Sequence, residues 1–315
     1  MGATLQAGSR KTLAPMSKKP VQIVFASDNH YTQPLGVALF SMLTNFKSET
    51  YVPEITILDG GISAENAAKI QALGRKFDIL IRFEKMDPEV FQRFHLVNYF
   101  TSTAYFRLLI PRIFKDKADS VLYLDCDIMV LGNLAALAET NLADYHLAAV
   151  RDAHGEALLK NHYCPFYAGV RDYFNSGVMV LNVRKLNADA IPDKALSFLK
   201  DHSKELNIPD QDVLNILCAD TWLPLDTRWN TQVDRNAPRM NPQPEVVHYI
   251  MRFKPWHFSY HNHYQKQYMR YLKAAWPNYR IQPVPLTLAL KQFLKRTPFS
   301  IPAVRLFKRF AGIPI

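Results

Sequence analysis

The amino-acid sequence predicts an α/β fold in which helices flank a parallel sheet. Two observations lead to this class. In the first third of the chain, short apolar runs typical of buried strands alternate with longer segments that suit helices. Of the 315 residues, 48% are hydrophobic and 21% are charged, a composition that supports one large α/β domain or two smaller ones.

The N-terminal elements follow this alternation. The first predicted strand is the apolar run 21–27, which leads into the polar cluster Asp28-Asn29-His30. Pro34 opens the first predicted helix, because proline fits the first turn of a helix. The next predicted elements are a strand over 54–59, a helix that Ser63 caps and that ends near 76, and a strand over 79–83. This β-α-β-α-β order favours parallel pairing of the strands.

The later elements place acidic residues at strand ends. In an open α/β sheet, ligands bind beyond the carboxyl ends of the strands, and Asp28, Asp125 and Asp127 all fall at such ends. We expect a helix from about 102, strands over 121–125, 128–130, 146–151 and 178–182, and helices over 192–204 and 211–218, followed by irregular segments.

The net charge of +10 lies in two tails. Residues 1–20 contain four basic residues and residues 281–315 contain six, and neither segment has an acidic residue. The segment 21–280 therefore holds 28 basic and 28 acidic residues, a balance that does not predict a nucleic-acid-binding core. We expect residues 1–20 to be a disordered leader or tag, because they lack the apolar centre of a signal peptide.

Cysteines, apolar runs and glycine motifs further limit the classes of protein to which the chain can belong. The three cysteines are widely spaced and odd in number, which favours a reducing cytoplasm over a disulfide framework. No stretch approaches the ~18 consecutive apolar residues of a transmembrane helix. The glycine patterns of dinucleotide-binding, P-loop and serine-hydrolase sites do not occur in the sequence, so a bound diphosphate needs another means of neutralisation.

A pair of aspartates carries the first chemical signal. Asp125 and Asp127 flank Cys126 directly after an apolar run. In an extended backbone, the side chains of residues i and i+2 point to the same side. Two neighbouring carboxylates repel each other, and a hard cation such as Mg²⁺ or Mn²⁺ stabilises them. A solvated acidic loop is the alternative, because two acids at this spacing also recur by chance.

Six segments in a fixed order extend this signal. They are VFASDNHY at 24–31, TAYFRLLIP at 103–111, VLYLDCDIMV at 121–130, FNSGVMVLN at 174–182, PDQDVLN at 209–215 and HYIMRFKPWH at 248–257. With these segments the chain resembles the family 8 retaining glycosyltransferases, and its pattern is closest to bacterial lipopolysaccharide or lipooligosaccharide galactosyl- and glucosyltransferases. The resemblance implies a GT-A type nucleotide-diphospho-sugar transferase fold over 21–280, with a mixed central sheet flanked by helices. It also implies a UDP-galactose or UDP-glucose donor.

The resemblance implies a metal site as well. Asp125, Asp127 and His248 would coordinate Mn²⁺, with Mg²⁺ as the alternative ion. Two carboxylates and a neutral imidazole suit Mn²⁺ and leave positions open for diphosphate oxygens. For His248 alone, a partly buried histidine without a ligand is the alternative. Lys254 is implied as the counter-charge of the β-phosphate. Met251 stands where the family has a glycine, so we expect either a different loop path or altered diphosphate binding.

Residues near the first strand match the positions that hold uracil in the family. Asp28 can accept a hydrogen bond from the uracil N3–H, and Tyr31 can stack on the base. His30 replaces the more usual asparagine. A loop tyrosine that covers the sheet edge is the alternative for Tyr31.

For the donor sugar, the resemblance implies a group of polar residues from four separate segments: Arg107, Asp152, Asn175, Asp210 and Gln211. Some of these positions have structural alternatives. Arg107 can be an exposed helical arginine, Asn175 can belong to a turn before a strand, and Asp210 can be a helix N-cap.

Retention of anomeric configuration is also implied by the resemblance. A covalent glycosyl intermediate needs a carboxylate near the anomeric carbon, but the pattern places Gln211 there, and an amide is a poor nucleophile. We therefore expect front-face attack with the leaving phosphate as base. Asp212 is the nearest acid in sequence for the covalent route. The predicted catalytic group is Gln211, Asp210, Asp152 and Asp212.

The segment 281–315 interleaves Lys and Arg with Leu, Phe and Val, which suits an anionic membrane surface. Pro298 and Pro302 exclude one long amphipathic helix. We expect a cytoplasmic enzyme, peripherally attached to the inner face of the cell membrane, with a lipid-linked oligosaccharide as acceptor and no nucleic-acid partner. A tail packed on the catalytic domain is the alternative.

Two other functions stay open at this point. A metal-dependent sugar-nucleotide pyrophosphorylase or hydrolase also uses paired aspartates, although it more naturally shows a glycine-rich phosphate loop. A noncatalytic basic protein that binds membranes or nucleic acid would depend on the two tails alone. The six ordered segments favour Mn²⁺-dependent retaining transfer of galactose or glucose to a lipopolysaccharide-type glycan.

Overall fold

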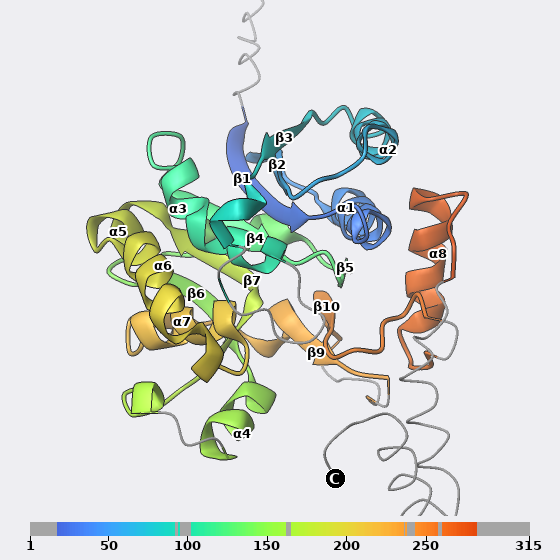
Figure 1. The fold of residues 1–315 in the computed structure, drawn as a ribbon. Coiled ribbons are helices and arrows are strands. Elements are labelled where there is room, and N and C mark those ends of the chain that lie inside the picture. The colour runs from blue at the N-terminus through green and yellow to red at the C-terminus, as the bar shows by residue number, and fades with distance from the viewer. Residues whose placement is uncertain are drawn as a thin grey trace, which may run out of the picture.

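A seven-stranded mixed sheet forms the centre of the molecule, and helices cover both of its faces (Figure 1). Most of the predicted leader and tail, residues 1–17 and 282–315, lies outside the described part of the chain. The computed structural model describes residues 18–91, 94, 102–161, 165–235, 237, 243–257 and 260–281.

The N-terminal part follows the predicted alternation of strands and helices. Its elements are β1 (Lys19–Ser27), α1 (Thr32–Asn45), β2 (Tyr51–Asp59), α2 (Ala64–Arg75) and β3 (Ile81–Lys85). β2 pairs in parallel with both β1 and β3, which confirms the predicted parallel pairing. The Ser63 side chain accepts a hydrogen bond from the backbone N–H of Asn66, so this serine caps α2 as predicted.

The central strands alternate their side chains between two hydrophobic cores. β4 (Ser120–Leu124) lies beside β1 in parallel. On β1, Ile23 and Phe25 pack with the core residues of α1, whereas Val24 packs in the core on the opposite side. Because both faces of these strands are buried, their sequences are continuous apolar runs rather than an alternation of apolar and polar residues.

The remaining elements complete the sheet and its two helical layers. They are η1 (Pro88–Phe91), η2 (Ser102–Leu109), α3 (Ile110–Ile113), β5 (Ile128–Val130), η3 (Leu134–Glu139), β6 (Leu147–Arg151), α4 (Ala153–Asn161), η4 (Pro165–Tyr167), β7 (Phe174–Asn182), α5 (Val183–Ala188), α6 (Ile191–His202), η5 (Ser203–Glu205), α7 (Pro209–Leu217), β8 (Trp222–Pro224), η6 (Thr227–Asn230), β9 (Thr231–Val233), β10 (Val246–Tyr249) and α8 (Gln265–Ala275), where η marks a 3₁₀ helix.

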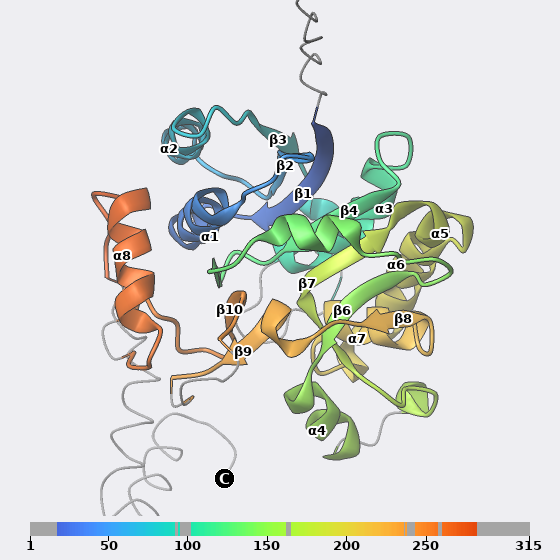
Figure 2. The same ribbon diagram turned by 180° about the vertical axis from the view of Figure 1, so that it is seen from behind.

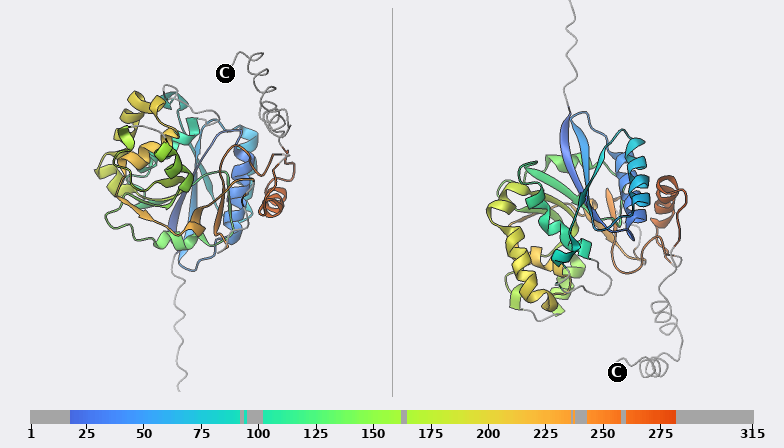
Figure 3. Two further views of the ribbon diagram at one scale, coloured as in Figure 1. Left: turned by 90° about the horizontal axis from the view of Figure 1, so that it is seen from below. Right: turned by 45° about the horizontal axis from the view of Figure 1, so that its top comes forward.

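The strand order of the large sheet is β3-β2-β1-β4-β7-β6-β8. β7 is antiparallel to both of its neighbours, β4 and β6, so the sheet is mixed. β8 forms one edge, where it pairs in parallel with β6, as the view from behind shows (Figure 2). The helices α1, α2 and α8 lie on one side of the molecule, and α3, α5, α6 and α7 lie on the other (Figure 3).

Two predictions of local structure are wrong. The segment 175–177, predicted to be a turn before a strand, lies inside β7. Turn propensity is overridden here because Asn175 and Ser176 find buried hydrogen-bond partners, and the pairing register of β7 with β6 shifts close by, between Ala149 and Val150. The helix predicted from about 102 is a 3₁₀ helix, η2, followed by the single α-helical turn of α3.

A second sheet, β5-β10-β9, brings the C-terminal part of the domain to the end of β4. β10 is antiparallel to β5, with His248 opposite Ile128, and parallel to β9. Irregular segments are predicted for this region, because strands of three or four residues are too short to show a periodicity. The pairing of β10 with β5 places His248 next to the turn between β4 and β5.

The helix α8 packs against α1, as two views agree (Figures 1 and 2). Tyr268 and Leu272 are buried on its inner face. Trp276, just after its C-terminal end, is 6% exposed and lies over Gly36 of α1, where an added Cβ would come within 2.9 Å of the indole ring. Within the described part of the chain, no helix is long and apolar enough to span a membrane.

Candidate donor and metal site

Segments that are distant in the sequence meet at one cavity beyond the carboxyl ends of β1 and β4, the edge of the sheet where ligands are predicted to bind. Its volume of about 540 Å³ is in the range of small-molecule sites. Its lining includes ten residues that the sequence predicts for the site: Tyr31, Arg107, Asp125, Asp127, Asp152, Asn175, Asp210, Gln211, His248 and Lys254.

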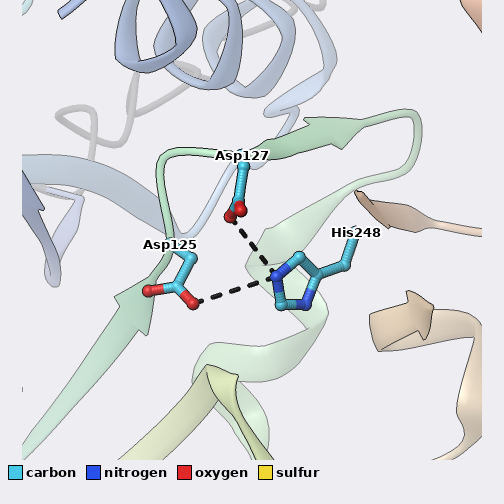
Figure 4. A group of neighbouring side chains, drawn as sticks. All are labelled: Asp125, Asp127 and His248. Atoms are coloured by element: carbon cyan, nitrogen blue, oxygen red, sulfur yellow. Dashed lines mark ion pairs between the residues drawn. The ribbon is translucent and has the colours of Figure 1, made fainter. Parts of the chain in front are cut away.

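The two aspartates of the metal prediction lie on the turn that joins β4 to β5. An extended backbone is predicted for this segment, but the chain turns at Cys126. Both carboxylates nevertheless face the imidazole of His248, which extends from β10 (Figure 4). The Nε2 atom of His248 lies 3.3 Å from Oδ1 of Asp127 and 3.8 Å from Oδ2 of Asp125.

These three side chains fit a divalent cation. One candidate ligand atom from each of Asp125, Asp127 and His248 lies within 4.8 Å of the other two. Gly177 of β7 leaves room beside them, because a Cβ there would lie 2.3 Å from Cε1 of His248 and 2.7 Å from Oδ2 of Asp125. Two carboxylate oxygens and one imidazole nitrogen form a donor set that suits Mn²⁺.

Lys254 is a buried cation next to the same aspartates. Its Nζ atom lies 2.7 Å from Oδ2 of Asp127 and donates a hydrogen bond to the carbonyl oxygen of Tyr249 at 2.5 Å. Burial raises the pKa of Asp127, but the positive charge of Lys254 opposes burial, and the pKa of Asp127 lies below its usual range. Asp127 is therefore ionised at neutral pH.

Arg107 lies on the other side of the cavity and pairs with two acids. It is 7% exposed, so the alternative of an exposed helical arginine is wrong. Its Nη2 atom lies 2.9 Å from Oδ1 of Asp125, and its Nε atom lies 3.3 Å from Oδ2 of Asp210. Burial lowers the pKa of Arg107, but the charge of Asp125 and further anionic neighbours outweigh burial and raise this pKa.

Asp210 is a buried acid of the sugar-binding prediction. The alternative of a helix N-cap is wrong, because α7 begins at Pro209 and Ile208 occupies the N-cap position. Burial raises the pKa of Asp210 to about 6, and the positive charge of Arg107 opposes this rise. This carboxyl group thus titrates well above the usual range of an aspartate.

Asp152, Asn175 and Gln211 form a connected polar cluster on the floor of the cavity. The Oδ2 atom of Asp152 accepts hydrogen bonds from Nδ2 of Asn175 at 3.0 Å and from Nε2 of Gln211 at 3.1 Å. The Oε1 atom of Gln211 accepts a hydrogen bond from the backbone N–H of Ser176 at 3.0 Å. All three side chains are buried, and their orientations are set by these contacts.

Asp212 differs from the other predicted catalytic residues, because it does not belong to the lining of the cavity. Its carboxylate accepts hydrogen bonds from the hydroxyls of Tyr167 and Tyr173 at 2.8 Å and 2.5 Å. It also accepts hydrogen bonds from the backbone N–H groups of Asn207 and Ile208, at 2.7 Å and 2.8 Å. These contacts hold the first turn of α7 and engage both carboxylate oxygens.

The residues predicted to hold the nucleoside lie at the end of β1. The Oδ1 atom of Asp28 accepts hydrogen bonds from the backbone N–H groups of His30 at 2.9 Å and Tyr31 at 3.1 Å. The ring of Tyr31 lines the cavity and meets Trp256 edge-on, with 5.9 Å between ring centroids. His30 is exposed, and neither His30 nor Asp28 belongs to the lining.

Met251 lines the cavity with a backbone conformation that favours glycine. Its φ angle is 67°, in the left-handed region, and 41% of the residue is exposed. The methionine thus occupies the conformation that explains a glycine at this position. A different loop path and altered diphosphate binding both stay predictions for this site.

Two supporting residues of the site were not predicted. Ser176 accepts a hydrogen bond from Nη1 of Arg107 at its side-chain oxygen at 2.7 Å. Asn230 lies 2.9 Å from Nδ1 of His248 through its Oδ1 atom. Ser176 stands in a segment that the sequence predicts as a turn, and Asn230 stands in no recognised motif.

Known proteins resemble this chain over most of its length. It matches the family described as Glycosyl transferase family 8 over residues 22–259. It is 31% identical over 274 residues to General stress protein A of Bacillus subtilis (strain 168), and the aligned region covers 80% of this chain and 93% of that protein. It is 30% identical over 246 residues to the Lipopolysaccharide 1,3-galactosyltransferase of Salmonella typhimurium, and the aligned region covers 75% of this chain and 72% of that protein.

A solved structure, the galactosyltransferase LgtC in complex with donor and acceptor sugar analogues, shares the fold with a TM-score of 0.68 and 25% identity. The similarity covers 85% of this chain and 99% of that chain. The fold and the family match together define a GT-A glycosyltransferase. The chain belongs to glycosyl transferase family 8, which confirms the predicted family, the predicted fold and the predicted enzyme class, a hexosyltransferase.

Proposed function

We propose that this enzyme moves galactose or glucose from a UDP-sugar to a lipopolysaccharide-type glycan, in a Mn²⁺-dependent reaction that retains the anomeric configuration. One observation carries the proposal. The three candidate metal ligands converge on the same cavity as the buried cations Arg107 and Lys254. Relatives named as a galactosyltransferase and a glucosyltransferase of lipopolysaccharide support the hexose and the acceptor class.

The hard step of the reaction is the departure of UDP from the sugar. Mn²⁺ held by Asp125, Asp127 and His248, or Mg²⁺ as the alternative, would neutralise the diphosphate and stabilise the charge of the leaving group. Lys254 supplies a second positive charge at the same end of the cavity, since its Nζ atom lies 2.7 Å from Asp127. This arrangement replaces the glycine-rich phosphate loop that the sequence lacks.

The donor sugar is proposed to bind among the buried acids and amides. Asp152, Asn175 and Asp210 present carboxylate and amide groups that suit sugar hydroxyls, and Arg107 holds Asp210 and Asp125 in place. The uracil is proposed to stack on Tyr31, with Asp28 as the nearby acceptor and His30 at the exposed edge.

Front-face attack is the proposed route to retention, with the leaving phosphate as base. The amide of Gln211 is engaged by Asp152 at Nε2 and by the Ser176 N–H at Oε1, and an amide is a poor nucleophile. Asp212, the acid considered for a covalent route, does not line the cavity, and both of its carboxylate oxygens are engaged by the hydroxyls of Tyr167 and Tyr173 and by the backbone N–H of Asn207. We therefore assign Asp212 the role of holding the start of α7. A sugar trapped covalently on Asp212 would contradict this route.

A peripheral position on the inner face of the cell membrane is proposed for this enzyme, which suits a lipid-linked acceptor. The exposed side of α8 carries Lys266, Arg270 and Lys273, spaced so that all three fall on one helix face. After Glu245 the sequence contains no further acidic residue through 315. A cationic face that leads into the basic tail supports attraction to anionic lipids.

The test of the proposed function is a UDP-release screen with several UDP-sugars, with and without Mn²⁺ and with a lipooligosaccharide acceptor. We expect release from UDP-galactose or UDP-glucose only when Mn²⁺ or Mg²⁺ is present. Asp127→Asn should lower the rate by about 100-fold, because it removes one charge from the cation site. Asp201→Asn, on the exposed surface of α6, is the matched control and should keep full activity.

The acceptor distinguishes the transferase from a sugar-nucleotide hydrolase or pyrophosphorylase. A transferase should release UDP faster when acceptor is added, and the sugar should appear on the acceptor. A hydrolase would be indifferent to the acceptor, and a pyrophosphorylase would require pyrophosphate. Full activity of Asp127→Asn, or no turnover and no binding of any UDP-sugar, would refute the proposal.

A further inference from the structure

Asn230 is a buried amide between the candidate metal site and the polar cluster of the sugar pocket. It is the last residue of η6, directly before β9, and only 1% of it is exposed. Its Oδ1 atom lies 2.9 Å from Nδ1 of His248, and its Nδ2 atom lies 2.8 Å from Oδ1 of Asn175. The neighbouring groups decide which of these atoms donates and which accepts.

The orientation of Asn175 follows from two groups with fixed roles. The backbone N–H of Gly177 can only donate, and it lies 3.0 Å from Oδ1 of Asn175. The carboxylate of Asp152 accepts, and its Oδ2 atom lies 3.0 Å from Nδ2 of Asn175. The amide of Asn175 therefore has its oxygen toward Gly177 and its nitrogen toward Asp152, and the reverse orientation would break both contacts.

The orientation of Asn230 then follows from that of Asn175. Because Oδ1 of Asn175 can only accept, Asn230 must point its NH₂ group toward it. The carbonyl oxygen of Asn230 is left facing Nδ1 of His248. An oxygen acceptor at this distance requires a hydrogen on Nδ1, so in the neutral imidazole the lone pair lies on Nε2, the atom that faces Asp125 and Asp127.

We propose that Asn230 is a positioning residue that fixes the tautomer and ring orientation of His248 for cation binding. The chain of contacts runs from Asp152 in the sugar pocket through Asn175 and Asn230 to His248. These three hydrogen bonds connect the sugar pocket with the candidate metal site, and the side chain of Asn230 itself contacts no cation. This inference rests on the proposed cation site. The inference goes beyond the proposed cation site because it assigns a role to Asn230, a residue that binds neither the cation nor the donor.

Two measurements test this role. The first is ¹⁵N NMR of protein labelled at histidine, without added metal and followed to alkaline pH until the His248 ring is neutral, in which the shifts of the two ring nitrogens report which one carries the hydrogen. The chain has ten histidines, so the His248 signals are identified by their loss in His248→Gln. We expect hydrogen on Nδ1 in the wild-type protein. Hydrogen on Nε2 and none on Nδ1 in the neutral ring would overturn the inference, and this measurement uses the wild-type protein, so it does not depend on the folding of an Asn230 variant.

The second measurement is Mn²⁺ affinity, followed by the electron paramagnetic resonance signal of free Mn²⁺ during titration. Asn230→Ala removes the acceptor and should weaken binding by about 10- to 100-fold, the usual effect of losing the partner of a metal-binding histidine. Asn230→Asp keeps an oxygen acceptor for Nδ1–H, so it should bind Mn²⁺ at least tenfold more tightly than Asn230→Ala. Equal affinities of wild type and Asn230→Ala would overturn the inference.

Asn215 provides a matched control. It is also 1% exposed, and its side chain makes hydrogen bonds to backbone groups of Phe174 and Gln211 rather than to His248. Asn215→Ala should lower the midpoint of thermal unfolding but leave Mn²⁺ affinity and the His248 tautomer unchanged. A loss of affinity equal to that of Asn230→Ala would show a general effect of buried amides and contradict the assignment. If wild-type protein binds no Mn²⁺, the proposed function fails, while the NMR result still decides the role of Asn230.

Discussion

Met251 carries a backbone conformation that its own side chain disfavours. The left-handed region costs an L-residue about 1–2 kcal/mol, whereas glycine enters it freely. Met251→Gly removes this cost and loses little packing, because 41% of the residue is exposed, but it also raises the entropy of the unfolded chain. We expect Met251→Gly to raise the free energy of unfolding by about 0.5 kcal/mol in urea titrations.

Met251→Val is the matched comparison, because a β-branched side chain is disfavoured most in this region. It should lower the free energy of unfolding by about 1 kcal/mol. The expected order of stability is glycine, then methionine, then valine. A glycine variant that is clearly less stable than the wild-type protein would contradict the left-handed conformation at this position.

Asp210 makes the stability of the metal-free protein depend on pH. Its pKa is raised to about 6 in the folded protein, against about 3.9 in the unfolded chain. Between these values the folded state binds more protons, so this group stabilises the fold below about pH 4 and loses its contribution as the pH rises through 6. The slope from this residue is at most ~1.4 kcal/mol per pH unit.

Asp210→Asn should therefore remove this slope from urea unfolding curves measured between pH 4 and pH 7 without metal. The difference between variant and wild type isolates Asp210 from other titrating groups. Asp201→Asn, an exposed aspartate on α6, should leave the wild-type slope in place. If the curve of Asp210→Asn runs parallel to that of the wild type, the raised pKa is wrong.

The sequence predicts the charged centre of the site better than the residues that support it. Asp125, Asp127 and His248 stand in recognisable segments, and the structure brings them within reach of one cation. Ser176 and Asn230 act through hydrogen bonds to groups far away in the chain, and no local pattern records such a contact. Their roles appear only when the strands that carry them are placed side by side.

At the scale of elements, long segments with clear periodicity were predicted well and short ones were not. β1 and α1 bury continuous apolar surface, so their sequences reveal them. β10 has four residues, and its pairing with β5 is set by tertiary packing. The start of β7 reads as a turn because Asn, Ser and Gly favour turns, but buried partners keep it extended.

The helix α8 depends on one large contact with α1. Trp276 is 6% exposed and fills the space that Gly36 leaves open. Trp276→Ala should lower the free energy of unfolding by about 3–5 kcal/mol and weaken hydrogen-exchange protection of α8 more than that of β1. Trp222→Ala, which removes an equally buried indole from the other core, should not single out α8. Equal hydrogen-exchange protection of α8 in both variants would contradict the dependence of α8 on the Trp276 contact.

At the scale of the whole molecule, charge is distributed unevenly along the chain. The body 21–280 is balanced, with 28 basic and 28 acidic residues. Within that balance, the acids lie before 246, and the C-terminal part is purely basic. α8 is the described helix of this part, and it lies on the side of the molecule opposite α6 (Figure 1). For the proposed attachment to a membrane, we therefore expect a flat anionic surface to orient the enzyme with α8 toward it.

The orientation can be tested by changing the same charge on opposite sides of the molecule. The triple variant Lys266→Gln, Arg270→Gln and Lys273→Gln should weaken binding to phosphatidylglycerol vesicles by roughly 10- to 100-fold, since each basic residue near such a surface contributes about 1 kcal/mol before screening. The control changes Lys194, Lys200 and Lys204 to Gln on the α6 side, where all three are exposed.

Sedimentation with vesicles of phosphatidylglycerol and of phosphatidylcholine measures both variants. The control should bind phosphatidylglycerol vesicles like the wild-type protein, because its charges face away from the surface. The difference between the two variants should shrink at high salt, which screens the attraction, and it should be absent with uncharged phosphatidylcholine. A truncation after Pro285 separates the tail from α8: if the truncated protein loses all binding, the α8 face has no role of its own. If both triple variants weaken binding equally, net charge alone drives attachment, and the proposed orientation with α8 toward the membrane is wrong.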